Sequence, residues 1–511
     1  MAQIQVNHLT FYYEGSYEEI FNDVSFSIDT DWKLGFVGRN GRGKTTFLNL
    51  LMGKYEYRGS ISAPVEFEYF PYEVSDKSRL AMDVVEEIYP DYERWKLLKE
   101  LKLMEMDEGA LYRPFDTLSN GEQTKVMLAV LFLREHRFLL IDEPTNHLDG
   151  EARLSVSRYL NKKTGFILVS HDRAFMDQCI DHVLSLNKNT IQVVQGNFTS
   201  WWDNKKQRDE FEAQENVKLK REIGRLKEAA RQTQRWSEDV EKTKWGTRNG
   251  GLKPDRGRVG HKAAKMMKRS KSTENRMEKA ASDKEKLLKD VETAERLKIM
   301  PLRHHKQVLA AMEDVSLGYP PYPGQQPVPV CSHLSMEIRE GERVVLEGRN
   351  GSGKSTIIKA ILGGEEGPAV ISGKVTKASG LIISYVSQDT SWLKGSLSEF
   401  GEAHGLDAAL FRAILRKLDF SRDHFEKEME YYSQGQKKKV LLAKSLCEQA
   451  HLYIWDEPLN FIDVFSRMQI EELIMTHNLT MILVEHDRAF TEKVAARRIR
   501  LSHASTAPYI F

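Results

Sequence analysis

Two stretches of the chain carry the same spacing of glycine, lysine and hydroxyl residues. Gly38-Arg-Asn-Gly-Arg-Gly43-Lys44-Thr45 and Gly348-Arg-Asn-Gly-Ser-Gly353-Lys354-Ser355 both fit G-x-x-x-x-G-K-[ST]. In this pattern the backbone N–H groups hold phosphates, the lysine reaches the β- and γ-phosphates, and the hydroxyl binds Mg²⁺. Each copy follows an apolar strand-like run and opens an apolar segment, as the pattern requires. The predicted ATP-binding residues of the two loops are Gly38, Asn40, Gly41, Gly43, Lys44, Thr45 and Thr46, with Gly348, Asn350, Gly351, Gly353, Lys354, Ser355 and Thr356.

An acidic pair ends an apolar run in each half, Asp142-Glu143 in the first and Asp456-Glu457 in the second. An acid at the end of a buried parallel strand lies at the carboxyl edge of the sheet, beside the phosphate loop. The aspartate can hold Mg²⁺ through water, and the glutamate can orient and deprotonate the attacking water. A solvated strand end is the alternative, which the matched spacing disfavours. The predicted metal ligands are therefore Thr45, Asp142, Ser355 and Asp456.

A histidine follows a later apolar run in each half, at His171 in Ser-His-Asp-Arg-Ala-Phe and at His486 in Glu-His-Asp-Arg-Ala-Phe. A lone histidine there would usually be structural, but its duplication favours a contact with the γ-phosphate or the attacking water. We reject a hydrolase triad, because adjacent residues on a strand point to opposite faces and no nucleophile elbow is present. The predicted catalytic residues are Glu143, Glu457, His171 and His486.

These motifs belong to an internal repeat of residues 1–200 and 308–511. Ser119 to Asp142 and Ser433 to Asp456 are both 23 residues apart. Strands that alternate with helical patterns predict an α/β fold in each half, with helices covering a parallel sheet.

Leu118-Ser-Asn-Gly-Glu-Gln123 and Tyr432-Ser-Gln-Gly-Gln436 complete a resemblance to ATP-binding-cassette (ABC) ATPases, which covers both halves. In that family the signature Ser and Gly of one domain contact the γ-phosphate held by the other domain. The resemblance implies that Ser433 and Gly435 close on ATP at Lys44, and that Ser119 and Gly121 close on ATP at Lys354. It also places Tyr13 and Tyr319 at the adenine-stacking position, with an ordinary core role as the alternative.

The segment between the halves has a different character. Residues 203–243 and 273–299 are charged with spaced apolar positions, which predicts two long helices. Residues 246–260 contain five glycines and Pro254, which cannot continue a helix. We predict a helical hairpin with a basic tip at about 242–271, and we disfavour a flexible tether because it needs neither feature. The predicted fold is α/β, with two tandem ABC-type P-loop ATPase domains at 1–200 and 301–511 joined by this linker at 201–300.

Charge is distributed unevenly along the chain. Residues 241–271 hold eleven Lys and Arg and two acids, a net of +9, so the overall +1 leaves −8 for the remainder. This concentration indicates a polyanion-binding element. No run approaches the ~20 apolar residues of a membrane span. The three cysteines form no C-x-x-C pair and no zinc spacing, so we expect a cytoplasmic protein without metal beyond Mg²⁺.

Two cassettes, no membrane domain and a charged hairpin resemble the ABC-F group. That resemblance implies binding to the bacterial ribosome and its 23S rRNA at the tRNA exit site, with the linker near the P-site tRNA and the peptidyl-transferase region. The variant Pro458-Leu-Asn-Phe-Ile-Asp463 and the long tip resemble the Lsa and Vga types, which protect ribosomes from lincosamides, pleuromutilins and streptogramin A. A housekeeping translation factor is the alternative. A DNA-repair or transporter-associated ATPase is disfavoured, because membrane segments and zinc-binding cysteines are missing.

The tip itself suits RNA. Its basic side chains can contact phosphates without sequence choice, and its tryptophan can stack on an exposed base. The predicted RNA-binding residues are Lys242, Lys244, Trp245, Arg248, Lys253, Arg256, Arg258 and Lys262.

The two ATP sites differ at one predicted metal ligand. The family places a Gln between phosphate loop and signature, and Gln388 fits this role in the second half. The first half has Tyr69-Phe-Pro-Tyr72 and no Gln there. We therefore predict slower ATP turnover at the site built on Lys44. Single-turnover hydrolysis by Glu143→Gln and by Glu457→Gln, measured separately, tests this, and equal rates would contradict it.

Overall fold

The computed structural model describes residues 2–13, 19–146, 148–186, 191–243, 297–320, 325–349, 351–364 and 367–501, together with ten residues between 265 and 280. The chain divides into two compact units. One comprises Met1–Trp201 and Ala294–Phe511 and contains both cassettes, and the other comprises Trp202–Thr293.

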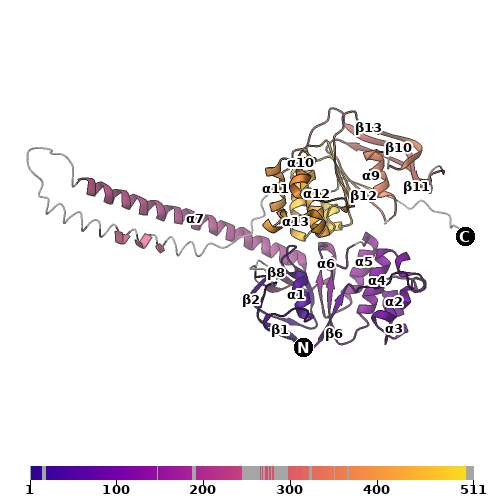
Figure 1. Ribbon diagram of the computed structural model, residues 1–511, viewed down its shortest axis with the longest axis horizontal. Coiled ribbons are helices and arrows are strands. Elements are labelled where there is room, and N and C mark those ends of the chain that lie inside the picture. Colours follow the sequence, from indigo (N-terminus) through magenta and orange to yellow (C-terminus); the bar gives the residue numbers. More distant parts are fainter. Residues whose placement is uncertain are drawn as a thin grey trace, which may run out of the picture. The chain divides into compact units, whose positions relative to one another are not determined.

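The first cassette combines a six-stranded sheet, in the order β5-β6-β7-β3-β8-β9, with a three-stranded antiparallel sheet, in the order β2-β1-β4 (Figure 1). All neighbours in the larger sheet are parallel except β8 and β9. The strands are β1 Gln3–Phe11, β2 Phe21–Asp29, β3 Lys33–Val37, β4 Arg58–Ser62, β5 Glu66–Phe70, β6 Arg137–Asp142, β7 Phe166–Val169, β8 His182–Leu186 and β9 Ile191–Gln195. The helices are α1 Lys44–Leu51, α2 Ala81–Ile88, α3 Arg94–Leu103, α4 Asn120–Leu131, α5 Gly150–Asn161 and α6 Arg173–Cys179, with short 3₁₀ turns η1 Glu108–Tyr112 and η2 Phe115–Thr117.

The second cassette repeats this plan with a fully parallel five-stranded sheet, in the order β14-β15-β16-β12-β17, and an antiparallel sheet, in the order β11-β10-β13. Its strands are β10 Val308–Tyr319, β11 Val328–Arg339, β12 Arg343–Glu347, β13 Ala369–Lys377, β14 Ile383–Val386, β15 Leu452–Asp456, β16 Met481–Val484 and β17 Arg497–Arg500. Its helices are α9 Lys354–Leu362, α10 Leu397–Ala403, α11 Ala408–Lys417, α12 Gln434–Cys447, α13 Val464–Thr476 and α14 Arg488–Val494, with 3₁₀ turns η3 Arg422–Phe425 and η4 Met429–Tyr431.

The central strands are buried on both faces, so they read as continuous apolar runs rather than as alternating patterns. β7 and β16 are buried at every residue. In the first cassette the helix that follows the phosphate loop fills the space between the two sheets with Phe47, which contacts Phe21, Phe26 and Phe36. Complete burial of such a side chain contributes about 1.5–3 kcal/mol. This packing fixes the phosphate loop at the carboxyl edge of the sheet.

The linker begins with one long helix, α7 Phe198–Thr243, shown in magenta in Figure 1. Its 46 residues correspond to ~70 Å at 1.5 Å per residue. The helix starts five residues before the predicted position 203. The described residues 271–273, 275–277 and 279–280 are also helical. Of the predicted tip at about 242–271, residues 244–264, 266, 267, 269 and 270 lie outside the described residues. Among the described residues, no helix is long and apolar enough to cross a membrane.

The predicted end of the second linker helix at 299 is wrong. Residues 297–300 are not helical, and Leu297 and Ile299 are buried in the core formed by the helices of the second cassette. Two features of the sequence explain this difference. The burial of two apolar side chains stabilises the non-helical backbone, and Pro301 disfavours helical backbone at the residue before it.

Candidate functional site

Glycines shape both phosphate loops. Gly43 and Gly353 have φ values of 100° and 91° and form the N-caps of α1 and α9. A Cβ atom at Gly43 would lie 2.4 Å from the Ile20 side chain, so both conformation and space require glycine there. Each loop therefore presents the N-terminus of a helix, whose free N–H groups and dipole attract phosphate.

The two loop lysines are folded onto their own loops. Lys44 Nζ donates to the carbonyl oxygens of Gly38 at 2.7 Å and Arg39 at 3.0 Å. Lys354 Nζ donates to Gly348 O at 2.8 Å and Arg349 O at 3.0 Å. Burial lowers the pKa of both lysines, which nearby carboxylates partly oppose. An ammonium group held in this way faces the loop interior, where an anionic phosphate would neutralise it.

The predicted metal ligands meet in pairs. The Thr45 hydroxyl donates to Asp142 Oδ2 at 3.0 Å, and the Ser355 hydroxyl donates to Asp456 Oδ2 at 2.9 Å. Asp456 Oδ1 is buried and has no hydrogen-bond partner within the described part of the chain. Burial raises the pKa of Asp456 to about 6. A buried carboxylate oxygen that lacks a donor suits a hard cation, so these oxygen ligands fit Mg²⁺.

Each glutamate predicted to be catalytic lies next to its predicted histidine. Glu143 Oε1 is 3.1 Å from His171 Nε2, and Glu457 Oε1 is 3.6 Å from His486 Nε2. Both glutamates have left-handed backbone, with φ of 50° and 47°. Such strain in a non-glycine residue is often found at functional sites. Ser170, His171 and Asp172 do not form a hydrolase triad. They lie beyond the end of β7 at Val169, and Asp172 is the N-cap of α6.

The surroundings of the two glutamates differ. Burial and the charge of Asp142 raise the pKa of Glu143 to about 8. Burial also acts on Glu457, but contact with His486 and the charges of Lys354 and Lys438 outweigh it and hold its pKa below the ordinary value.

Side-chain amides account for a further difference between the sites. Gln388 Nε2 donates to Glu457 Oε2 at 2.8 Å, and Asn460 Nδ2 donates to the same oxygen at 2.7 Å. In the first cassette Tyr72 stands at the place of Gln388 and donates to Glu68 instead, at 3.0 Å.

The signature residues begin helices. Ser119 and Ser433 are the N-caps of α4 and α12, and each forms a capping box with the third helical residue. Position 435 has room only for glycine, because a Cβ atom there would lie 2.5 Å from Phe461 O. The same carbonyl accepts a hydrogen bond from Asn40 Nδ2 of the first phosphate loop at 2.9 Å. The second signature and the first phosphate loop therefore meet through Phe461.

The other signature reaches the second phosphate loop less directly. A Cβ atom at Gly121 would lie 3.5 Å from Ala152. Glu151, the residue before Ala152, forms an ion pair at 2.5 Å with Arg349 of the second phosphate loop. A cleft of about 720 Å³ is lined here by Asp149, Glu151, Gly348 and Arg349, among others. Asn350 lies outside the described residues.

The two tyrosines predicted to stack on adenine differ in their surroundings. Tyr13 is 40% exposed, packs edge-on against Phe11 and Tyr55, and shares a 2.8 Å hydrogen bond with the Thr46 hydroxyl. This bond places its ring beside α1, where adenine stacking is possible. Tyr319 is the last residue of β10 and is partly buried. Of the predicted RNA-binding residues, Lys242 is in α7, and the other seven lie outside the described residues.

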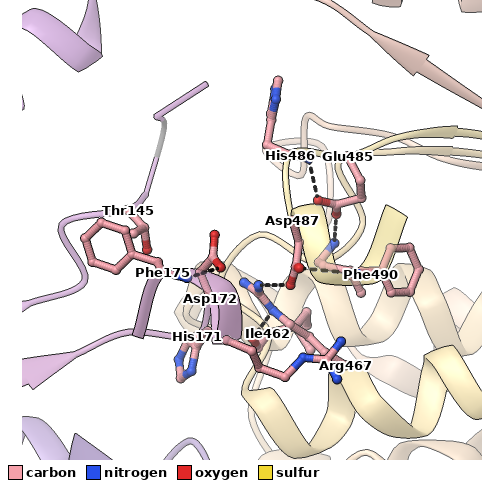
Figure 2. Close-up of polar contacts among 12 residues, drawn as sticks. Thr145, His171, Asp172, Phe175, Ile462, Arg467, Glu485, His486, Asp487 and Phe490 are labelled. Atoms are coloured by element: carbon pink, nitrogen blue, oxygen red, sulfur yellow. Dashed lines mark hydrogen bonds and ion pairs between the residues drawn. The ribbon is translucent and has the colours of Figure 1, made fainter. Parts of the chain in front are cut away.

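Sequence reasoning missed a buried charge cluster between the cassettes. Arg153 Nη1 pairs with Asp172 at 3.0 Å, and Arg467 Nη1 pairs with Asp487 at 3.0 Å. Figure 2 shows Asp172 of the first cassette beside Arg467 and Asp487 of the second. Burial and the charge of Asp487 raise the pKa of Asp172. A signal was available, because each arginine follows by four residues the aspartate that caps α5 or α13.

Each of these arginines also ties two loops of its own cassette together. Arg467 Nε donates to Ile462 O, next to Phe461, while its other end holds Asp487, next to His486. Arg153 Nε donates to Leu148 O in the same way. The loop that reaches the opposite phosphate loop is thus connected to the histidine of its own site.

Comparison with known proteins identifies the family. Residues 21–146 and 331–460, half of the chain, match the family described as ABC transporter. The chain belongs to this family. It is an ATPase of the ABC type, and the predicted fold of two tandem ABC ATPase domains is confirmed.

Relatives of this ABC ATPase match it over nearly its full length. The ribosome protection protein VmlR of Bacillus subtilis is 27% identical over 503 residues, covering 96% of this chain and 85% of VmlR. ABC transporter F family member 2 of Arabidopsis thaliana is 23% identical and covers 99% of this chain and 77% of that protein. These matches support the ABC-F group. The archaeal ribosome recycling factor aABCE1, solved in complex with the stalk protein aP1, shares the fold with a TM-score of 0.59 at 20% identity, covering 96% of this chain and 87% of aABCE1.

The raised pKa of Glu143 predicts a pH dependence restricted to the first site. In the Glu457→Gln variant, hydrolysis should rise about tenfold from pH 7 to pH 9, because a base with a pKa of about 8 becomes ionised over this range. In the Glu143→Gln variant the rate should change little, because Glu457 is already ionised. Single-turnover rates across this pH range provide the measurement, and parallel profiles would refute the prediction.

The buried arginine should matter for stability more than its exposed neighbour. Arg467→Met leaves the carboxylate of Asp487 buried without its cation and should destabilise the fold by about 3–5 kcal/mol. Arg488→Met is the matched control, because its pair with Glu492 is largely exposed and should contribute little. Urea unfolding followed by circular dichroism compares the midpoints, and similar shifts for both variants would argue against the assigned role.

Proposed function

We propose that this chain is an ABC-F ATPase that binds the bacterial ribosome at the tRNA exit site. Its linker lies near the P-site tRNA and the peptidyl-transferase centre and protects the ribosome from lincosamide, pleuromutilin and streptogramin A antibiotics. The match with VmlR across 96% of the chain carries this proposal. A protein in this role works in the cytoplasm in association with ribosomes.

ATP supplies the closing force in this proposal. Nucleotide held by Lys44 is capped by Ser433 and Gly435, and nucleotide held by Lys354 is capped by Ser119 and Gly121. The hydrogen bond from Asn40 to Phe461 supports the first of these pairings, because Phe461 O lies against Gly435. A ligand that binds the closed form better shifts the population toward closure.

Magnesium is held by Thr45 and Asp142 in the first site and by Ser355, Gln388 and Asp456 in the second. When bound, it neutralises charge that develops on the phosphates. Glu143 and Glu457 accept a proton from the attacking water, and His171 and His486 hold that water or the γ-phosphate. Burial, together with the charges of Lys44 and Arg467, lowers the pKa of His171 well below its ordinary value, so this imidazole is neutral and can accept a hydrogen bond.

In this proposal the linker at about 201–300 is the part of the chain that protects the ribosome. The ATPase domains on either side of it are residues 1–200 and 301–511. Support comes from α7, which is long and charged, and from the net charge of +9 over residues 241–271. In the proposal, Lys242, Lys244, Arg248, Lys253, Arg256, Arg258 and Lys262 contact 23S rRNA or tRNA phosphates, and Trp245 stacks on a base.

A housekeeping translation factor of the same architecture is the second candidate. The observation that favours it is the match to ABC transporter F family member 2 of Arabidopsis thaliana over 99% of this chain. Drug tolerance separates the two candidates, and ribosome binding does not.

We expect the Glu143→Gln/Glu457→Gln variant to cosediment with bacterial ribosomes in the presence of ATP and to remain in the supernatant without it. Blocked hydrolysis should trap the closed form, which is the form that binds. A matched variant with Lys44→Ala and Lys354→Ala, which weakens phosphate binding, should not cosediment. Failure of the trapped variant to cosediment would contradict the proposal.

Growth of a susceptible bacterium in the presence of each drug then distinguishes ribosome protection from a housekeeping role. The wild-type chain should raise tolerance to the three drug classes, and a chain that lacks residues 246–260 should cosediment as before but give no tolerance. Binding without any gain in tolerance would favour the housekeeping factor. Full tolerance without residues 246–260 would contradict the role of the tip.

A further inference from the structure

The first ATP site contains a tyrosine that neither the sequence pattern nor the family match singles out. The Tyr69 hydroxyl donates to Asp142 Oδ2 at 3.0 Å, and the Thr45 hydroxyl donates to the same oxygen at 3.0 Å. Tyr69 is on β5, where it pairs with Leu140 of β6, two residues before Asp142. The parallel register therefore aims the phenol at the end of the neighbouring strand. Burial and the charge of Asp142 raise the pKa of Tyr69 well above its ordinary value, so the phenol stays protonated and donates.

The second site has a tyrosine at the same register position, but this tyrosine makes a different contact. Tyr385 pairs with Ile454, two residues before Asp456. Its hydroxyl contacts Ser387. Asp456 Oδ2 accepts from Ser355, and its Oδ1 has no donor among the residues that the structure describes. The tyrosine is thus present in both halves, and its bond to the aspartate is found in the first.

This difference coincides with the missing amide. Gln388 contacts Glu457 in the second site, whereas Tyr72 at the same place turns to Glu68. The first site therefore has no counterpart of Gln388, although Asn146 stands at the place of Asn460. The phenol of Tyr69 instead contacts Asp142, the neighbour of Glu143.

We propose that Tyr69 is a positioning residue for the metal of the first ATP site, which holds the Asp142 carboxylate in place for Mg²⁺. Thr45 and Asp142 are hydrogen-bonded to each other in this structure, and both are proposed ligands of the metal. Thr45 would bind the metal through the oxygen of the hydroxyl that holds Asp142, whereas Tyr69 is not a proposed ligand and would hold this carboxylate from a second side. Residues that orient a ligand in this way typically change metal affinity 10- to 100-fold when they are replaced. The inference rests on the proposed magnesium site.

The test uses Mn²⁺ as a spectroscopic probe with a non-hydrolysable ATP analogue and the full-length chain. Lys354→Ala isolates the first site, and Lys44→Ala isolates the second. Tyr69→Phe in the first background should weaken Mn²⁺ binding about tenfold, as measured by electron paramagnetic resonance. Tyr385→Phe in the second background is the matched control and should leave Mn²⁺ binding unchanged.

Nucleotide binding without metal separates positioning from a general structural effect. In EDTA, Tyr69→Phe should bind a fluorescent ATP analogue as the unsubstituted chain does. Equal weakening with and without metal, unchanged Mn²⁺ affinity, or an equal loss in Tyr385→Phe would each overturn the assignment. Absence of Mn²⁺ binding in the unsubstituted chain would instead contradict the magnesium site itself.

Discussion

The contact between the phosphate-loop hydroxyl and the strand-end aspartate is the constraint on which both halves of this protein depend. Thr45 reaches Asp142, and Ser355 reaches Asp456, across 97 and 101 residues of chain. Such a contact requires that the loop strand and the acidic strand end at the same edge of the sheet, and here they are parallel with one strand between them. The strand orders β6-β7-β3 and β15-β16-β12 meet that condition. The apolar runs in these strands thus serve the site, because they set the order and register that bring hydroxyl and carboxylate together.

The same scaffold supports two chemically different sites. Around Glu457, two amides, a histidine and two lysines favour the ionised carboxylate, whereas Glu143 is buried beside Asp142 and has no counterpart of Gln388. The asymmetry inferred from a missing Gln therefore has an electrostatic counterpart at the glutamate that we propose as the general base. An ATPase with one fast site and one slow site can remain closed for longer than one with two fast sites, if closure lasts until the slower nucleotide is hydrolysed.

Much of this arrangement could be predicted from sequence, because it rests on local patterns. The phosphate loops, acidic pairs and histidines are short motifs with fixed spacing, and the structure brings hydroxyl, aspartate, glutamate and histidine together in each cassette. The prediction for 273–299 was wrong at its end, because the burial of Leu297 and Ile299 depends on a partner surface that periodicity does not contain. Tyr69, Arg153 and Arg467 were missed for a related reason. Their partners are distant in sequence, and their types alone do not distinguish them from ordinary strand or helix residues.

The loops that precede the capping aspartates show how far the two halves have diverged. In the first cassette the Thr145 and Ser170 hydroxyls lie 3.0 Å apart in the core. In the second, a leucine and a glutamate take these places, and Glu485 Oε1 accepts from the buried Leu459 N–H at 2.8 Å. A recombination event that transferred serine to position 485 would leave this N–H without its acceptor. The two cassettes therefore join the equivalent loops through different contacts, so a change at position 485 bears on position 459 as well.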